Sequence, residues 1–437
     1  MKIVSILKGA GVEKSSAYIE VIKLLVRKGI DVDIVIANQN RNYIEESYYL
    51  NNANINLQIL NIIDCNNGKV EILKKIIRKL KLEKICTTLL LAYQRICFGI
   101  NRKKYEDDKS YAYDIFLDPS MRGYKLNENY DYILVNDEYG LLWADWINEK
   151  SDKKYKIIYY CLELYWEHYS LPMEKKWQNF SEYLLFEEAR KALLKASLIV
   201  IQDEARWEVL CKYTGLGKDV CKVFLPVSMQ SYKNVNTDVL SEKINIEKGK
   251  KVIFYPTFIS AKRGCIELIH MTRFLNNEYL TVIHGFTATQ GFLREVEKNI
   301  DDTERVIVSN TTFDYQELVD MHQDVWCVFL YYGESDNNNR YIVNASNKLV
   351  MSLQAGKPII TIGNHMLADL CKETGCGVSM NSWSGEEFVR AVSELDRNYE
   401  QYCWNARKCF EERYNINIYG EVLYDALIQN LSGGSYD

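Results

Sequence analysis

The chain has 437 residues, of which 47% are hydrophobic and 26% are charged, and its formal net charge at pH 7 is −5. This length and composition indicate a globular protein with two domains, each large enough for its own core. The acidic balance and the lack of interleaved arginine and aromatic motifs argue against nucleic-acid binding. Twelve cysteines and five histidines are scattered without paired metal-ligand spacing. We therefore predict no metal site, and reduced thiols in a cytoplasmic protein.

The first elements follow the alternation of a parallel α/β sheet. An apolar run over residues 3–7 predicts a buried strand and is too short for a signal sequence. A loop with Gly9 and Gly11 follows, then a helix to about Lys28 and a second strand over 31–36. Gly9 and Gly11 form a G-x-G fragment without the third glycine of a dinucleotide-binding fingerprint. This pattern disfavours an NAD-dependent oxidoreductase.

The stretch from Lys69 to Lys104 interrupts the alternation. It carries eleven lysines and arginines against two acidic residues, and Ile72, Ile76 and Leu80 lie on one face of a predicted helix. A cationic amphipathic helix can bind anionic headgroups while its apolar face enters the lipid interface. Two interpretations stay open: peripheral contact with an anionic membrane, and a solvated helix packed on the first sheet.

Regular alternation resumes at Tyr130, with predicted strands over 132–135, 157–161 and 198–201. Polar side chains that could take part in proton transfer follow the first two of these strands. They are Asp137 and Glu138 after the first, and Glu163 and His168 after the second. Such a group facing a cleft can accept a hydroxyl proton. Asp137, Glu163 and His168 are therefore catalytic candidates, and a structural role is the alternative for each.

A polar stretch over 230–250 predicts a linker, and residue 251 begins a second series of strands and helices. Its first motif is a strand containing Tyr255, a loop through Lys262, and a helix predicted over 263–274 that begins with Arg263-Gly264. The second motif is a strand over 325–330, Tyr332, an asparagine-rich loop, and a helix opened by Ser346-Asn347-Lys348 and ended by Gly356. The N–H groups and dipole of this second helix favour an anion at its start.

These two motifs resemble the donor-binding half of GT-B glycosyltransferases, most closely the group-4-like enzymes that build bacterial surface polysaccharides. The resemblance implies an α/β protein in which two Rossmann-like β/α/β domains face each other across a cleft. The implied division is an acceptor-binding domain over 1–230 with the basic insertion at 69–104, a donor-binding domain over 231–415, and a helix over 416–437 that packs back on the first domain.

The resemblance further implies a nucleotide-sugar donor, a glycan or lipid-linked acceptor, and neither a cofactor nor a metal ion. The implied donor-binding residues are Tyr255, Lys262, Arg263, Tyr332, Ser346, Asn347 and Lys348. Cations among them could bind the donor diphosphate and stabilise the charge on the leaving nucleotide. Gly9 and Gly11 stand where the family backbone approaches the acceptor. Glu163 stands where the family has the sequence His-Glu-Leu.

Two departures from the family pattern keep other functions open. Met351 stands where many relatives have a glutamate that binds ribose hydroxyls, for which Glu334 and Asp336 are candidate substitutes, and Leu162 replaces the histidine before Glu163. The leading hypothesis is a glycosyltransferase of bacterial cell-surface polysaccharide or glycoconjugate biosynthesis. The alternatives are a nucleotide-sugar epimerase of the same fold and a non-catalytic partner subunit with a decayed donor site.

Overall fold

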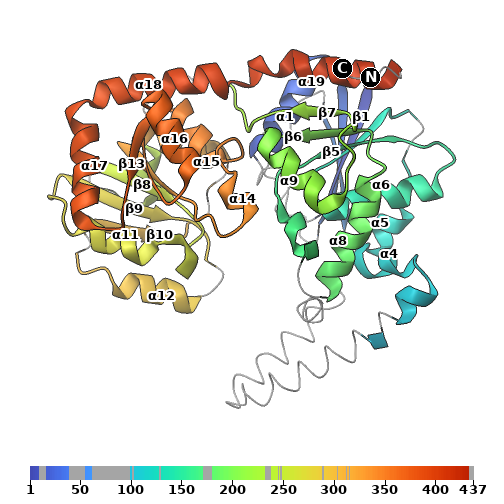
Figure 1. Cartoon of the computed structure of the whole chain (residues 1–437), viewed down its shortest axis with the longest axis horizontal. Coiled ribbons are helices and arrows are strands. Elements are labelled where there is room, and N and C mark those ends of the chain that lie inside the picture. The colour runs from blue at the N-terminus through green and yellow to red at the C-terminus, as the bar shows by residue number, and fades with distance from the viewer. Residues whose placement is uncertain are drawn as a thin grey trace. The chain divides into compact units, whose positions relative to one another are not determined.

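The computed structural model describes residues 1–8, 16–38, 55–61, 99–100, 103–126, 129–170, 180–231, 238–244, 246, 249–287, 290–302, 304–311, 313 and 315–432. They form two parallel sheets with helices packed against the strands (Figure 1). The chain divides into two compact units, Met1–Lys14 with Ile22–Phe224 and Val422–Asp437, and Ser15–Val21 with Leu225–Glu421. This architecture confirms the predicted α/β class with two Rossmann-like units.

The first unit is built on a seven-stranded sheet with the order β3-β2-β1-β4-β5-β6-β7. Its strands are β1 (Lys2–Lys8), β2 (Asp31–Asn38), β3 (Ile55–Asn61), β4 (Tyr132–Val135), β5 (Lys156–Tyr160), β6 (Leu198–Ile201) and β7 (Lys222–Phe224). The strand order reverses between β1 and β4. In open parallel sheets, ligands bind at the carboxyl ends of the strands beside such a reversal.

The helices of the first unit include α1 (Ser16–Arg27), α4 (Tyr111–Phe116), α5 (Pro119–Gly123), α6 (Glu138–Lys150), η3 (Tyr165–Ser170), α8 (Phe180–Leu193), α9 (Glu204–Thr214) and α19 (Gly420–Ser432). The first turns of α1 belong to the second unit. Helix α19 packs on the first sheet although it ends the described chain. The Tyr132 hydroxyl donates to the Leu427 carbonyl at 2.8 Å, and the Asn430 amide donates to the Ser197 carbonyl at 2.8 Å.

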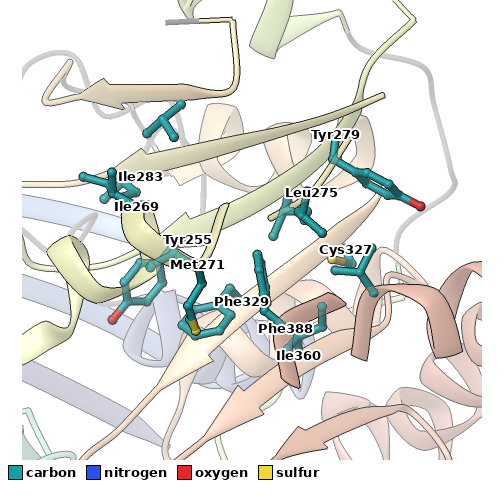
Figure 2. Close-up of a cluster of buried hydrophobic side chains, with 14 of the residues drawn as sticks. Tyr255, Ile269, Met271, Leu275, Tyr279, Ile283, Cys327, Phe329, Ile360 and Phe388 are labelled. Atoms are coloured by element: carbon teal, nitrogen blue, oxygen red, sulfur yellow. The ribbon is translucent and has the colours of Figure 1, made fainter. Parts of the chain in front are cut away.

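The second unit is built on a six-stranded sheet with the order β10-β9-β8-β11-β12-β13. Its strands are β8 (Lys251–Pro256), β9 (Tyr279–His284), β10 (Val306–Ser309), β11 (Cys327–Tyr331), β12 (Ile359–Ile362) and β13 (Gly377–Met380). Here the order reverses between β8 and β11. The ring of Phe329 on β11 packs edge-on against the rings of Tyr255 on β8 and of Phe388 (Figure 2). The ring centres are 5.1 Å and 6.1 Å apart, respectively. The two strands at the reversal therefore share one packed core.

The helices of the second unit are α10 (Val239–Ile244), η4 (Ala261–Arg263), α11 (Cys265–Thr272), α12 (Gln290–Lys298), α13 (Tyr315–Asp324), α14 (Asn337–Arg340), α15 (Asn347–Gln354), α16 (His365–Thr374), α17 (Gly385–Arg397), α18 (Tyr399–Arg413) and η5 (Ile416–Ile418), as far as the structure describes them. The amphipathic pattern over 385–410 predicts one long helix. This prediction is wrong, because the backbone of Asn398 leaves the helical region and separates α17 from α18. The polar stretch 230–250, predicted as a linker, contains α10.

The basic segment 69–104 lies largely outside the described residues, which include only 99–100 and 103–104 of it. Its amphipathic helix therefore stays a prediction. In the described parts of the chain, no helix combines the length and the apolar character needed to cross a bilayer.

Candidate functional site

Helix α15 begins and ends at local signals in the sequence. Ser346 is its N-cap, and the Ser346 hydroxyl accepts a hydrogen bond from the Leu349 N–H at 3.1 Å. Gly356 follows the helix with φ +66°, a left-handed backbone that favours glycine. This lets the Lys357 N–H donate back to the Ser352 carbonyl at 2.9 Å, as in a Schellman motif. Both ends of α15 are therefore defined by short-range contacts.

Tyr332 joins the end of β11 to the start of α15. Its hydroxyl shares a 2.7 Å hydrogen bond with the Ser346 hydroxyl. The Arg263 guanidinium carbon and the Lys348 ammonium nitrogen each lie 5.9 Å from the centre of the Tyr332 ring, within cation–π range. The structure thus brings together four of the seven residues predicted to bind the donor.

Neither of these two cations has an acidic partner among the residues that the structure describes. Arg263 donates to the neutral amide oxygen of Asn339 at 3.2 Å, and the Lys348 ammonium makes no hydrogen bond or ion pair within the described chain. Burial, and then the charge of Arg263, lowers the pKa of Lys348 to about 8, although some of the side chain's surface stays accessible. An anion bound between the two cations would offset the cost of burying the Lys348 charge and the repulsion between Lys348 and Arg263.

The prediction that Arg263 sits in the first turn of a helix is wrong. Arg263 ends the 3₁₀ turn η4, and Gly264, with φ +64°, is the N-cap of α11. A Cβ at Gly264 would come within 2.4 Å of the Trp383 ring, so the close approach of Trp383 requires glycine. The hydroxyl of the buried Tyr255 donates a hydrogen bond to the Arg263 carbonyl and so anchors the turn to β8. Lys262, in the same turn, is exposed.

Asn347 and Met351, in the first two turns of α15, differ in polarity. The Asn347 side-chain oxygen is buried and has no hydrogen-bond partner within the described chain. Met351 is 5% exposed and packs as a core side chain. The position of the family's ribose-binding glutamate is therefore filled here by an apolar residue that faces the interior.

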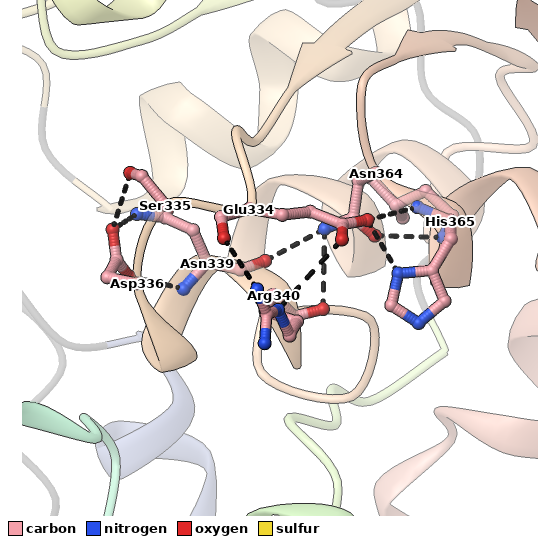
Figure 3. Close-up of polar contacts among 8 residues, drawn as sticks. Glu334, Ser335, Asp336, Asn339, Arg340, Asn364 and His365 are labelled. Carbon is pink, nitrogen blue, oxygen red and sulfur yellow. Dashed lines mark hydrogen bonds and ion pairs between the residues drawn. The ribbon is translucent and has the colours of Figure 1, made fainter. Parts of the chain in front are cut away.

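The loop between β11 and α15 is a connected polar network (Figure 3). The Glu334 carboxylate accepts a hydrogen bond from the backbone N–H of His365 at 2.7 Å. The ring nitrogen Nδ1 of His365 contacts the same carboxylate oxygen. Asp336 is the N-cap of α14 and accepts the Asn339 N–H at 2.8 Å. Both carboxylates that were candidate substitutes for the missing glutamate are therefore engaged inside this network.

In the first unit, two adjacent carboxyl groups lie at the strand reversal. Asp137 is the N-cap of α6, and its carboxylate accepts the Gly140 N–H at 2.6 Å. Burial raises the pKa of Asp137 to about 6, against the opposing effects of the Gly140 N–H and of Lys8. Burial, followed by the neighbouring charge of Asp137, raises the pKa of Glu138 to about 7. Glu138 can thus gain or lose a proton near neutral pH.

Lys8, at the carboxyl end of β1, is a residue that the sequence analysis missed. Its ammonium donates to the Phe116 carbonyl at 2.7 Å and lies 3.9 Å from the centre of the Tyr139 ring. Burial lowers its pKa, and the charges of Asp137 and Asp118 oppose that shift. Its position in the sequence could have identified Lys8, because a charged residue at the end of the first strand of such a sheet lies where the strand order reverses.

Glu163 lies just beyond the end of β5 and is exposed. Its charge makes a minor contribution to the raised pKa of Glu138, after burial and the charge of Asp137. The backbone before Glu163 is held by the fully buried Arg206, whose guanidinium donates to the Leu162 carbonyl at 2.9 Å.

The remaining predicted site residues are not placed by the structure. His168 belongs to the turn η3, but its side chain lies outside the described part of the chain. Gly9 and Gly11, predicted to contact the acceptor, also lie outside the described residues. Their roles therefore stay predictions.

No family model and no curated protein matches the sequence. Solved structures do match along nearly the whole chain. Sucrose-phosphate synthase from Thermosynechococcus elongatus has a TM-score of 0.61 and 13% identity, covering 99% of this chain and 100% of that one. Anabaena HepE in complex with UDP-glucose has a TM-score of 0.61 and 12% identity, covering 98% and 100%.

A third match is WaaG, described as a glycosyltransferase involved in lipopolysaccharide biosynthesis. It has a TM-score of 0.57 and 12% identity, covering 99% of this chain and 100% of that one. At 12–13% sequence identity, these matches show that the chain shares its fold with the three proteins. The chain has the GT-B fold, which confirms the fold inferred from the two sequence motifs.

Proposed function

We propose that the protein is a glycosyltransferase that moves a sugar from a nucleotide-sugar to a glycan or lipid-linked acceptor. The observation that carries this proposal is the pair of cations Arg263 and Lys348 at the ring of Tyr332, without an acidic partner among the described residues. An anion is the ligand that such a pair favours. A matching structure on the same fold, Anabaena HepE, holds UDP-glucose.

The chemistry follows from where charge develops. When the bond between the sugar and the diphosphate breaks, negative charge grows on the leaving nucleotide. Arg263, Lys348 and the free N–H groups at the start of α15 would bind that diphosphate and lower the energy of the transition state. Two fixed cations supply the positive charge that a divalent metal supplies in other transferases, so we propose a metal-independent reaction without a cofactor.

The acceptor needs a group that removes a proton from its hydroxyl. Among the carboxyl groups at the β4 and β5 ends, we assign this role to Glu138, with Glu163 as the second candidate. The Asp137 carboxylate already serves as the cap of α6, whereas the pKa of Glu138, about 7, suits proton transfer near neutral pH. His168 stays a candidate for the same role.

We further propose that the acceptor belongs to bacterial surface polysaccharide or glycoconjugate synthesis at the cytoplasmic face of the membrane. The basic segment 69–104 supports this setting, because cationic residues and an apolar face would hold the protein at an anionic bilayer that carries lipid-linked acceptors. Glutamine in place of Lys74, Lys75, Arg78 and Lys79 should abolish salt-sensitive binding to anionic vesicles and leave transfer to a soluble acceptor analogue intact.

The experiment that tests the function is a thermal-shift screen against UDP-, GDP-, TDP- and CMP-linked sugars, followed by transfer assays with the sugar that binds. A ligand at one hundred times its dissociation constant stabilises the folded state by about 2.7 kcal/mol. Conversion of the nucleotide-sugar without an acceptor would identify an epimerase instead. Binding without turnover, together with a stable complex with an active transferase, would identify a partner subunit.

A further inference from the structure

Asn339 links an acidic side chain to the cation at the centre of the donor site. On one side, the Asp336 carboxylate accepts the Asn339 side-chain N–H at 2.6 Å (Figure 3). On the other side, the Asn339 amide oxygen accepts the Arg263 guanidinium N–H at 3.2 Å. A carboxylate only accepts and a guanidinium only donates, so a single orientation of the amide satisfies both neighbours.

The backbone of Asn339 is held as firmly as its side chain. Its N–H donates to Asp336 at 2.8 Å, and its carbonyl accepts the amide of Asn364 at 2.8 Å. Asn364 is 3% exposed and is itself the N-cap of α16, where its side-chain oxygen accepts the Leu367 N–H at 3.1 Å. The amide oxygen that faces Arg263 is therefore positioned by two helix caps.

We propose that Asn339 is a positioning residue, which orients the Arg263 guanidinium for the diphosphate without neutralising it. This inference rests on the proposed function. A carboxylate at position 339 would also hold the guanidinium, but it would form an ion pair and compete with the bound anion. The neutral amide keeps the negative charge of Asp336 one hydrogen bond away from Arg263. The uncompensated charge of Arg263 is then a consequence of this arrangement.

The test exchanges the two side chains in the double variant Asp336→Asn/Asn339→Asp. Asparagine is as good an N-cap as aspartate, and the new amide can still donate to the new carboxylate. The pattern of hydrogen bonds is kept, while the negative charge moves next to Arg263. Binding of pyrophosphate, UDP and GDP is measured by calorimetry at several salt concentrations, together with the melting temperature. The matched control is Asn277→Asp, which places the same new charge at an exposed position outside this network.

We expect the exchange variant to melt close to the wild type and to bind the tightest of these probes at least about tenfold more weakly, with less dependence on salt. Asn339→Ala should weaken binding by a smaller factor, because the guanidinium keeps its charge but loses its orientation. Asn277→Asp should bind as the wild type does.

Wild-type affinity and salt dependence in the exchange variant would overturn the inference, since a purely structural Asn339 tolerates the exchange. No binding of any probe by the wild type would remove the anion site and the inference with it. Tight probe binding by a wild type that transfers no sugar, with the exchange variant impaired, would support the inference and contradict the proposed function alone.

Discussion

The hydroxyl groups of Tyr332 and Ser346 share a 2.7 Å hydrogen bond that ties the end of β11 to the first turn of α15. This bond places the Tyr332 ring beside Lys348, two residues along the helix from Ser346, and within reach of Arg263 from the turn after β8. These side chains therefore meet at the strand reversal of the second sheet, where ligands of such folds bind.

The affinity for the nucleotide-sugar should fall as the pH rises through about 8, because burial and Arg263 lower the pKa of Lys348 to about 8 and the neutral amine no longer attracts the diphosphate. Lys348→Arg should move this fall to higher pH, because a guanidinium stays charged. Donor dissociation constants between pH 6.5 and 9.5 measure the effect. A profile that is the same for both proteins would show that Lys348 does not carry the titration.

Transfer should lose rate as the pH falls through about 7, since the raised pKa of Glu138, about 7, leaves its carboxyl group protonated and unable to accept a proton below that value. Glu138→Gln should lower kcat by about a hundredfold or more and remove the acidic limb of the pH–rate profile. The exposed Glu208→Gln is the control. Retention of the acidic limb in Glu138→Gln would transfer the role to Glu163, Asp137 or His168.

Gly264→Ala should destabilise the protein by about 1–3 kcal/mol, because the residue has a left-handed backbone and its new Cβ would meet the Trp383 ring. Since Gly264 directly follows Arg263, donor affinity should fall as well. Gly217→Ala is the matched control, because no atom lies within 4 Å of a Cβ built there. Urea unfolding of both variants measures the difference, and equal midpoints would show that the turn adapts.

Removal of divalent cations should leave the transfer rate within about twofold, because in the proposed mechanism Arg263 and Lys348 supply the positive charge at the leaving group. The assay compares initial rates in EDTA, in magnesium and in manganese with the same donor and acceptor. Loss of activity in EDTA that manganese restores would place a metal ion in the mechanism and remove that role from the two cations.

Much of the local structure around α15 could be predicted because its signals are local. The serine cap of α15, the glycine that ends it, and the buried strand that follows are all visible within twenty residues. Arg263 was predicted to begin a helix, whereas it ends the turn η4. The cause is the contact between Gly264 and Trp383, more than one hundred residues apart, which the sequence of the turn does not reveal.

The residues that were missed act through tertiary neighbours. Asn339 lies in an asparagine-rich loop where nothing local distinguishes it from Asn337 or Asn338. Its role depends on Asp336 on one side and Arg263 on the other. Lys8 was missed for a similar reason, since the charge of Asp137 acts on its pKa only when β1 and β4 become neighbours.

The most direct measurement is titration of the wild type, Arg263→Ala, Lys348→Ala and the double variant with the nucleotide-sugar that stabilises the wild type best. Lys372→Ala, at an exposed position on α16, is the control. Loss of one charged partner of the diphosphate should weaken binding about ten- to hundredfold. The double variant should lose measurable affinity, with melting temperatures near that of the wild type. Wild-type affinity in both single variants would contradict the account, because the diphosphate would then bind elsewhere.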